Sequence, residues 1–271
     1  MQNLSQKQPV TSRENKTIKY LHSLLEPKHR KKEGVFLVEG IKMVGEALRE
    51  PGRVRLFVAA PSLPAGKGRL LLERAETQSV EILWISERLT GALSESKTPQ
   101  PVMAVVSMKE YAEEALVKPN PGLFVITHEL QDPGNLGTII RTAEAVGAAG
   151  VAVTQNTADP YNARAIRASM GSILRMPVVR LNDLHDCIGK YKQWGFQTVA
   201  LAISGSTPHL DLDLRKPTTV IVGQEGGGLP EDIVQRVDYR VRIPMSPTID
   251  SLNVATASAV ILYEALRQRT L

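Results

Sequence analysis

The stretch IPMSPTIDSLNVATASAVILYEALRQR, from Ile243 to Arg269, decides which fold the C-terminal part of the chain can adopt. Apolar residues recur in it every three or four positions, which predicts a helix with one face in the core. These residues are Leu252, Ala255, Ala259, Leu262 and Leu266. Asp250 or Ser251 can cap the N-terminus of this helix. Capping by either residue leaves Asn253 unexplained, so its role has to be sought in the rest of the chain.

Upstream of this stretch, apolar runs of strand length alternate with helical patterns. The runs are LFVITH, GVAVT, PVVRL, FQTVALAIS, TTVIVG and YRVRIPM. Such an alternation predicts a parallel sheet that is covered by helices on both faces. Ligands of these sheets bind beyond the carboxyl ends of the strands. We therefore expect the chemistry in the loops that follow VITH, VIVG and RIPM.

The first half of the chain carries a second and smaller α/β pattern. Short strands such as VFLVEG and VRLFVAA alternate with helical segments such as IKMVGEALRE. The sequence predicts a flexible N-terminus over 1–12, a compact α/β domain over 13–108, and a linker with two prolines over 109–121. The C-terminal domain then covers residues 122–271.

Composition narrows the possible functions. A net charge of +5 favours a polyanionic partner, and nucleic acid has roughly even odds on charge alone. The single cysteine, Cys187, excludes an internal disulfide and a site with several cysteine ligands, and we expect it to be a small buried residue. We expect no metal site. The first residues lack an apolar signal core and no apolar run could span a bilayer, so we expect a cytoplasmic protein without membrane contact.

The first of the three loops is HELQDPGNLG, followed by the helix TIIRTAE. Its proline and glycines shape a turn, Asn135 precedes the helix, and Thr138 and Arg141 follow at a spacing of one helical turn. Taken alone, this pattern is explained at least as well by turn chemistry and a surface arginine.

The second loop, VIVGQEGGGLPEDIV, joins a strand to a helix through several glycines. Its backbone amides could face a phosphate, but the dinucleotide fingerprint requires a glycine where this chain has Glu225. A carboxylate would repel a pyrophosphate and suits a cationic or hydroxyl-bearing ligand. A plain glycine-rich turn explains the loop about equally well.

Together, these loops resemble the three motifs of the SpoU (TrmH) family of knotted RNA methyltransferases. The matching stretches are DPGNLGTIIRTAEAVGAAGV, VGQEGGGL and IPMSPTIDSLNVATASAVILYEAL, with DPYNARAIRASMGSILRMPVV between the first two. EGVFLVEGIKMVGEAL and TPQPVMAVV resemble the ribosomal-protein-like RNA-binding domain that often precedes this fold. The resemblance covers nearly the whole chain from about Asn15.

The resemblance implies a C-terminal α/β domain with a parallel sheet, whose tail is threaded into a deep trefoil knot. It also implies transfer of a methyl group from S-adenosylmethionine to a ribose 2′-hydroxyl of structured RNA, with ribosomal RNA favoured over transfer RNA. The knot forms the cofactor pocket in this family. The cofactor-binding residues would be Gly223, Ile243, Met245, Leu252 and Val254.

The catalytic residues implied by the resemblance are Arg141, Asn135, Glu225, Ser251 and Asn253. Arg141 occupies the position often assigned as the base, but a guanidinium stays protonated up to about pH 12. We therefore expect Arg141 to clamp a phosphate and to stabilise the developing alkoxide. Asn135 and Glu225 would orient Arg141 or the sugar, while Ser251 and Asn253 would bind the substrate.

The basic segments are the expected contacts to RNA phosphates. One set is Lys28, Arg30, Lys31 and Lys32, and the other is Arg164 and Arg167. For the first set, a solvated charge run is nearly as good an explanation. The family resemblance also implies a homodimer whose sites draw on both subunits.

Two residues depart from the family pattern. Pro247 stands where the third motif usually has glycine, and Ala255 replaces a serine. These departures keep a non-catalytic RNA-binding protein as one alternative. A nucleotide-dependent enzyme that uses the glycine-rich loop for phosphate is the other.

Overall fold

The computed structural model describes residues 8–117 and 122–270. The chain forms two compact units. The first unit comprises the residues up to Lys109 together with Tyr161–Ala163, and the second comprises Glu110–Pro160 and the residues from Arg164 onward.

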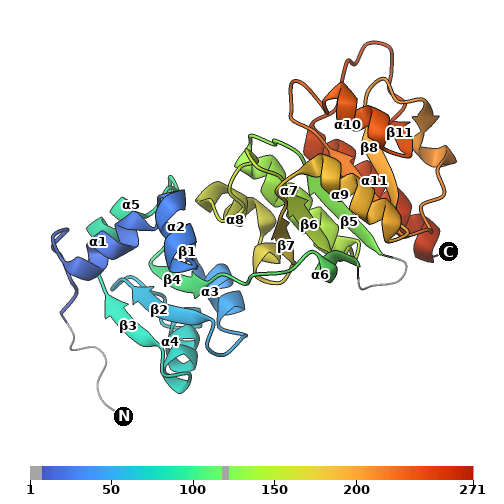
Figure 1. Cartoon of the computed structure of the whole chain (residues 1–271). Coiled ribbons are helices and arrows are strands. Elements are labelled where there is room, and N and C mark those ends of the chain that lie inside the picture. The colour runs from blue at the N-terminus through green and yellow to red at the C-terminus, as the bar shows by residue number, and fades with distance from the viewer. Residues whose placement is uncertain (1–7, 118–121, 271) are drawn as a thin grey trace. The chain divides into compact units, whose positions relative to one another are not determined.

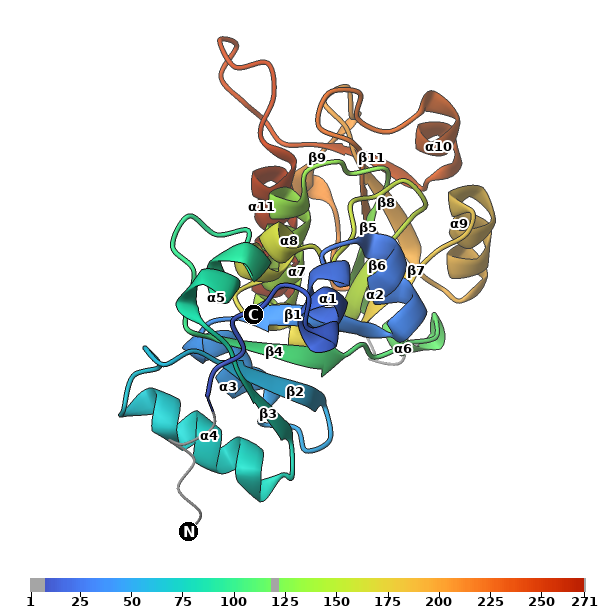
Figure 2. The same ribbon diagram turned by 90° about the vertical axis from the view of Figure 1, so that its left-hand side faces the viewer.

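The first unit is an α/β domain built on a four-stranded sheet in the order β1-β4-β2-β3. Its elements are α1 (Lys16–Ser23), α2 (Pro27–Glu33), β1 (Val35–Glu39), α3 (Ile41–Ala47), β2 (Val54–Ala59), α4 (Lys67–Thr77), β3 (Glu81–Trp84), α5 (Glu87–Leu93) and β4 (Val102–Ser107). β4 pairs antiparallel with both β1 and β2, whereas β2 and β3 are parallel. α1 and α5 pack on one face of the sheet, and α3 and α4 lie on the other (Figure 2).

Parts of this unit differ from the sequence-based expectation. The basic run after Leu25 forms the short helix α2, because Pro27 is favourable in the first helical turn and Gly34 ends the helix with a left-handed backbone at φ 63°. Residues 1–7 of the predicted flexible N-terminus lie outside the described residues. Val10, within the same predicted segment, exchanges backbone hydrogen bonds with Trp84 and Ser86, so this part is ordered against β3.

The second unit contains a seven-stranded sheet in the order β7-β6-β5-β10-β8-β11-β9. Its elements are α6 (Glu114–Val117), β5 (Leu123–Thr127), α7 (Pro133–Ala145), β6 (Gly150–Val153), α8 (Ala163–Ser169), η2 (Ser172–Leu174), β7 (Val178–Arg180), α9 (Leu184–Gln193), β8 (Gln197–Leu201), β9 (Thr207–Pro208), η3 (His209–Asp211), β10 (Thr218–Val222), α10 (Glu231–Arg236), β11 (Tyr239–Arg242) and α11 (Val254–Thr270). All paired strands run parallel. The predicted parallel sheet is confirmed.

Helices cover both faces of this sheet, as the continuous apolar strands predict (Figure 1). α6, α9 and α10 bury their apolar sides on one face, where Tyr191 meets Phe124. α7 packs on the other face against β5 and β6, and α11 packs on α7. Cys187 lies in the first of these cores with 6% exposure, and burial raises the pKa of its thiol to about 11, so the prediction of a small buried residue is confirmed.

The predicted linker 109–121 contributes to this core. Leu116 of α6 is fully buried against the sheet, and residues from Glu110 onward belong to the second unit. Residues 118–121 of the predicted linker lie outside the described residues. Residues 110–117 of the predicted linker are therefore a packed part of the second unit, since Leu116 is buried on one face of its sheet.

One of the last strands, β10, returns to the middle of the sheet. β10 lies between β5 and β8, so a late strand is flanked by two earlier ones, and α11 then packs on α7 from the beginning of the unit. This crossing order brings the third predicted loop next to the first. The threading of the tail through a loop remains a prediction. In the described part of the chain, none of the helices has the length and apolarity required to span a bilayer.

Candidate active site

Asn253 joins the third loop to the first. Its side-chain oxygen accepts hydrogen bonds from the backbone N–H groups of Ala255 (2.9 Å) and Thr256 (3.2 Å), so Asn253 caps α11. Its amide nitrogen donates to the side-chain oxygen of Asn135 at 3.0 Å. The expectation that Asp250 or Ser251 caps the helix is wrong, because α11 begins only at Val254.

Asp132 shapes the first loop by capping α7. Its Oδ1 accepts hydrogen bonds from the N–H groups of Gly134 (2.5 Å) and Asn135 (3.1 Å), and Pro133 occupies the first helical position. Asn135 consequently lies in the first turn of α7. Its amide group accepts the hydrogen bond from Asn253 and donates one to Glu225.

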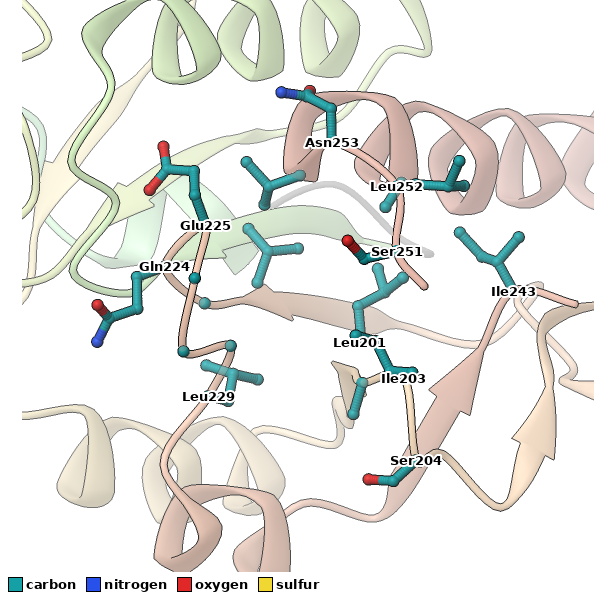
Figure 3. A pocket seen from close by; sticks show the side chains of 18 of the residues that line it. Leu201, Ile203, Ser204, Gln224, Glu225, Leu229, Ile243, Ser251, Leu252 and Asn253 are labelled. Atoms are coloured by element: carbon teal, nitrogen blue, oxygen red, sulfur yellow. The ribbon is translucent and has the colours of Figure 1, made fainter. Parts of the chain in front are cut away.

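The second loop is a tight turn closed by a pair of hydrogen bonds. Gln224 N–H donates to the Gly228 carbonyl at 3.1 Å, and Gly228 N–H donates back to the Gln224 carbonyl at 3.0 Å. A Cβ on Gly223 would overlap the Gly228 carbonyl group, so only glycine allows the turn to close. Glu225 projects from this turn on the side of Asn253 (Figure 3).

The Glu225 carboxylate holds the first loop in place. Oε1 accepts hydrogen bonds from Asn135 Nδ2 (3.0 Å) and Asp132 N–H (3.1 Å), and Oε2 accepts one from Gln131 N–H (3.2 Å). Burial alone would raise the pKa of this carboxyl, but the hydrogen bonds outweigh that effect and hold the pKa below its ordinary value. Asn253, Asn135 and Glu225 thus form one hydrogen-bonded chain across the three loops.

A cavity of about 570 Å³ lies beside these hydrogen-bonded side chains, at the carboxyl ends of β8, β10 and β11. Its volume falls within the range of about 300–1,000 Å³ that is usual for small-molecule sites. All five residues expected to bind the cofactor line it, namely Gly223, Ile243, Met245, Leu252 and Val254. Three of the expected catalytic residues, Glu225, Ser251 and Asn253, also line it.

The chemistry of the lining fits S-adenosylmethionine. Apolar side chains such as Leu201, Ile243 and Leu252 can cover an adenine ring, and Glu225 and Glu231 provide negative charge for a cationic ligand. Among the described residues, the lining includes no lysine or arginine. A polyphosphate would therefore meet carboxylates without a compensating cation, which argues against the nucleotide-dependent alternative.

The segment from Leu201 to Ser204 also lines the cavity, and sequence reasoning missed it (Figure 3). This segment begins at the last residue of β8, which lies between β10 and β11 in the sheet. The run FQTVALAIS predicts a strand, and its carboxyl end could have been included by the same rule that selected the other loops. The neighbours of β8 in the sheet, however, cannot be read from the sequence.

Arg141 lies apart from the cavity lining. It is exposed on α7, six residues beyond Asn135, which corresponds to about 9 Å along a helix. Within one chain, the structure therefore joins Asn135, Glu225 and Asn253 by hydrogen bonds and adds Ser251 through the cavity. Arg141 is exposed and does not line the cavity.

The residues expected to contact RNA divide into exposed and buried ones. Lys28, Lys31 and Lys32 are exposed on α2. Arg30 is 3% exposed, and its Nη1 donates to the carbonyls of Leu24 (2.8 Å) and Leu25 (2.6 Å). The expectation that Arg30 meets a phosphate is therefore corrected, because its guanidinium is used to hold α2 against the end of α1.

The second basic set lies on α8. Arg164 and Arg167 are both exposed, and Arg164 forms an ion pair with Asp132 at 2.9 Å. Among the residues that the structure describes, no three histidine, cysteine or acidic side chains are placed to hold a metal ion.

Two family models match the chain. Residues 122–263 match the SpoU rRNA Methylase family, and residues 15–104 match the MRM3-like substrate binding domain. The two matches correspond to the second and the first unit, respectively.

Similar proteins of known sequence match over almost their whole length. The chain is 32% identical to the 23S rRNA (guanosine(2553)-2′-O)-methyltransferase RlmP of Bacillus subtilis, over 94% of this chain and 97% of that protein. It is 31% identical to the 23S rRNA (uridine(2479)-2′-O)-methyltransferase of Streptomyces viridochromogenes, over 96% of this chain and 92% of that protein.

A solved structure shares both units. The AdoMet-bound rRNA methyltransferase from Sinorhizobium meliloti superposes with a TM-score of 0.84 at 31% identity, covering 96% of this chain and 97% of that one. The same arrangement of elements is therefore compatible with bound cofactor in a similar protein.

Proposed function

The chain belongs to the SpoU rRNA methylase family, and we propose that it transfers a methyl group from S-adenosylmethionine to a ribose 2′-hydroxyl of ribosomal RNA. The observation that carries this proposal is the hydrogen-bonded chain of Asn253, Asn135 and Glu225 at the edge of the cavity. Similarity to two 23S rRNA 2′-O-methyltransferases supports ribosomal RNA as the substrate.

The cavity is the proposed cofactor site. Ile243, Leu252 and Val254 would cover the apolar part of the cofactor, and the Gly223 turn and Met245 would complete the wall. When bound, S-adenosylmethionine supplies a methyl group that its positive sulfur already activates. The protein therefore has two remaining tasks, which are to position the ribose oxygen and to favour its deprotonated form.

Arg141 is the residue proposed to perform the second task. Its guanidinium stays charged, so it would bind a phosphate of the substrate and stabilise the negative charge that develops on the 2′-oxygen, while the hydroxyl proton would pass to that phosphate or to water. Ser251 and Asn253 would hold the nucleotide through hydrogen bonds. Asn135 and Glu225 would keep the three loops together, and such positioning can lower a barrier by about 7–11 kcal/mol in the best-oriented models.

The exposed position of Arg141 supports a homodimer. Because Arg141 is exposed and lies outside the lining of the cavity in its own chain, a second copy could place it near substrate bound by the partner. We propose that the active site draws on both subunits. A ribosomal RNA substrate also favours the cytoplasm as the site of action.

RNA binding is proposed for both units. Lys28, Lys31 and Lys32 on α2 would contact phosphates from a substrate-binding domain over 13–108, in agreement with the matched family model. Arg164 and Arg167 would contact phosphates from the methyltransferase domain over 122–271. Phosphate contacts add affinity without sequence choice, so the target would be selected by RNA shape.

The proposal is tested by methyl transfer with Arg141→Ala. Removal of one transition-state hydrogen-bond donor typically lowers kcat about 100-fold to 1,000-fold. We expect such a loss with rRNA from a strain that lacks the gene, measured with labelled S-adenosylmethionine. Cofactor affinity should change by less than about threefold, since Arg141 lies outside the cavity lining. Arg236→Ala, an exposed arginine on α10, is the control, and full activity of Arg141→Ala would remove Arg141 from this role.

A further inference from the structure

Asp132 links three segments of the second unit. Its Oδ1 caps α7 through Gly134 and Asn135, and its N–H donates to Glu225 at 3.1 Å. Its other carboxylate oxygen, Oδ2, forms the ion pair with Arg164 at 2.9 Å. Asp132 therefore connects an arginine of α8 to Asn135 through its carboxylate and to Glu225 through its backbone N–H.

The backbone of α8 is held firmly against α7. A Cβ on Gly137 would overlap the Ala165 carbonyl oxygen and come within 2.8 Å of the Ala168 side chain. This close approach fixes the starting point of the Arg164 side chain relative to the first turn of α7. The ion pair then fixes the position of its guanidinium.

The guanidinium can hold Asp132 and still receive an anion. The Arg164 side chain is 61% exposed, so a phosphate oxygen can reach it from solvent. Arginine presents five N–H donors in a planar fork, which allows two anions to be contacted at fixed angles. The negative charge of Asp132 is partly offset by the positive N-terminus of α7 that it caps, so a phosphate is still attracted.

We propose that Arg164 is a positioning residue for methyl transfer. Its guanidinium binds a phosphate of the substrate RNA, and its ion pair with Asp132 fixes that phosphate relative to Asn135, Glu225 and Asn253. This inference rests on the proposed RNA methyl transfer. It separates Arg164 from Arg167, one helical turn away on α8, for which an affinity contact alone is proposed.

The test compares Arg164→Ala with Arg167→Ala in steady-state methyl transfer. Both variants should raise KM for rRNA purified from a strain that lacks the gene, because each loses one phosphate contact. Arg164→Ala should also lower kcat at least tenfold more than Arg167→Ala does. A displacement of the substrate by about 1 Å can lower the rate about 100-fold. Equal kcat values for the two variants would overturn the inference.

A second variant guards against a purely structural effect. Asp132→Asn keeps an oxygen that can cap α7 but removes the charge that pairs with Arg164. Asp132→Asn should lower kcat by about the same factor as Arg164→Ala. The kcat of the Asp132→Asn/Arg164→Ala double variant should lie within about threefold of the kcat of either single variant. Multiplication of the two losses in the double variant would refute a shared role.

Folding and the proposed function are checked in the same series. Thermal melting and S-adenosylmethionine affinity should stay near the wild-type values in Arg164→Lys, which retains the positive charge. Compared with Arg164→Ala, the KM of Arg164→Lys should return to the wild-type value. Its kcat should return only in part, because an ammonium lacks the planar fork of donors. Absence of methyl transfer by the wild-type protein would instead reject the proposed function, and the inference with it.

Discussion

Asn253 shows how much one side chain contributes at the residue scale. Its side-chain oxygen accepts hydrogen bonds from the free N–H groups at the start of α11, and its side-chain nitrogen donates to Asn135 in the first turn of α7, 118 positions away in the chain. The sequence predicts a specific role for Asn253, because a polar asparagine at the start of a largely apolar helix is not explained by packing. The sequence does not predict which residue it bonds, since that depends on the sheet order.

Gly223 provides a prediction with a matched control. Gly223→Ala should lower S-adenosylmethionine affinity at least tenfold, because the new Cβ overlaps the Gly228 carbonyl and opens the turn that lines the cavity. Gly226→Ala, in the same turn, places its Cβ in open space and should have a much smaller effect. The measurement is calorimetric titration with the cofactor. Equal affinities for the two variants would contradict the role given to the turn.

Arg30 marks a limit of residue-scale prediction. In the sequence it stands within a run of basic residues, and nothing separates it from Lys31 or Lys32. In the structure it is buried, because α2 turns one of its sides inward and the guanidinium finds two backbone carbonyls there. A helix of seven residues is too short for periodicity to show which side faces inward.

At the scale of elements, the last turn of α11 fastens the segment that leads into β10. Gln268 accepts from Leu214 N–H at 2.7 Å and donates to the Leu212 carbonyl at 2.9 Å. Arg269 donates to the carbonyls of Leu214 and Lys216, both at 2.8 Å. α11 is only weakly amphipathic, so these hydrogen bonds help to fix the position of its C-terminal turn against the segment that precedes β10.

Glu264 makes the stability of the C-terminal turns of α11 depend on pH. Arg267 donates to both oxygens of its carboxylate, and these hydrogen bonds lower its pKa to about 2 from an ordinary value of 4.5. A carboxyl with a lowered pKa in the folded state stabilises above its unfolded pKa and loses this contribution as pH falls through the folded pKa. The contribution of Glu264 should therefore be complete at pH 7 and disappear between about pH 4.5 and 2.

Urea unfolding at several pH values tests this point. Glu264→Gln should lower the free energy of unfolding by about 1.5–3 kcal/mol at pH 7, the range for hydrogen bonds to charged groups. The difference from wild type should shrink as pH approaches about 3. Thr256→Ala, exposed on the same helix, is the control. A difference that is constant from pH 7 to pH 3 would contradict the assignment.

The exposed lysines of α2 lead to a prediction about salt. Lys31→Ala and Lys32→Ala should each weaken rRNA binding and reduce the slope of log affinity against log salt by about 1, because one phosphate contact is lost. Arg30→Ala should instead lower the thermal stability, since it leaves the Leu24 and Leu25 carbonyls unpaired. The measurement is filter binding over a range of salt concentrations. Unchanged slopes for both lysine variants would show that Lys31 and Lys32 are solvated and do not contact RNA phosphates.

Elements were predictable where their signal was long and regular. The apolar strands β5, β6, β8 and β10 stand out in the sequence, and so does α11, because burial on both sides demands continuous apolar residues. Shorter elements were not predicted, including α5, α6 and β9, which have seven, four and two residues. α6 was hidden in a segment with the composition of a linker, although Leu116 packs fully into the core.

At the scale of the whole molecule, the order of the strands creates the site. Asn135 of the first loop region is 90 positions from Glu225 and 118 positions from Asn253 in the chain, and these residues converge because β10 inserts between β5 and β8. The family resemblance predicted this convergence, whereas the periodicity of the chain predicted only a parallel sheet. A threaded tail and a homodimer remain predictions that complete this arrangement.

The most direct test of the central claim is a map of ribose 2′-O-methylation in ribosomal RNA from cells with and without the gene. The account predicts that deletion removes methylation at a defined ribose, that the wild-type gene restores it, and that Arg141→Ala does not. An unchanged methylation map after deletion, or full restoration by Arg141→Ala, would contradict it.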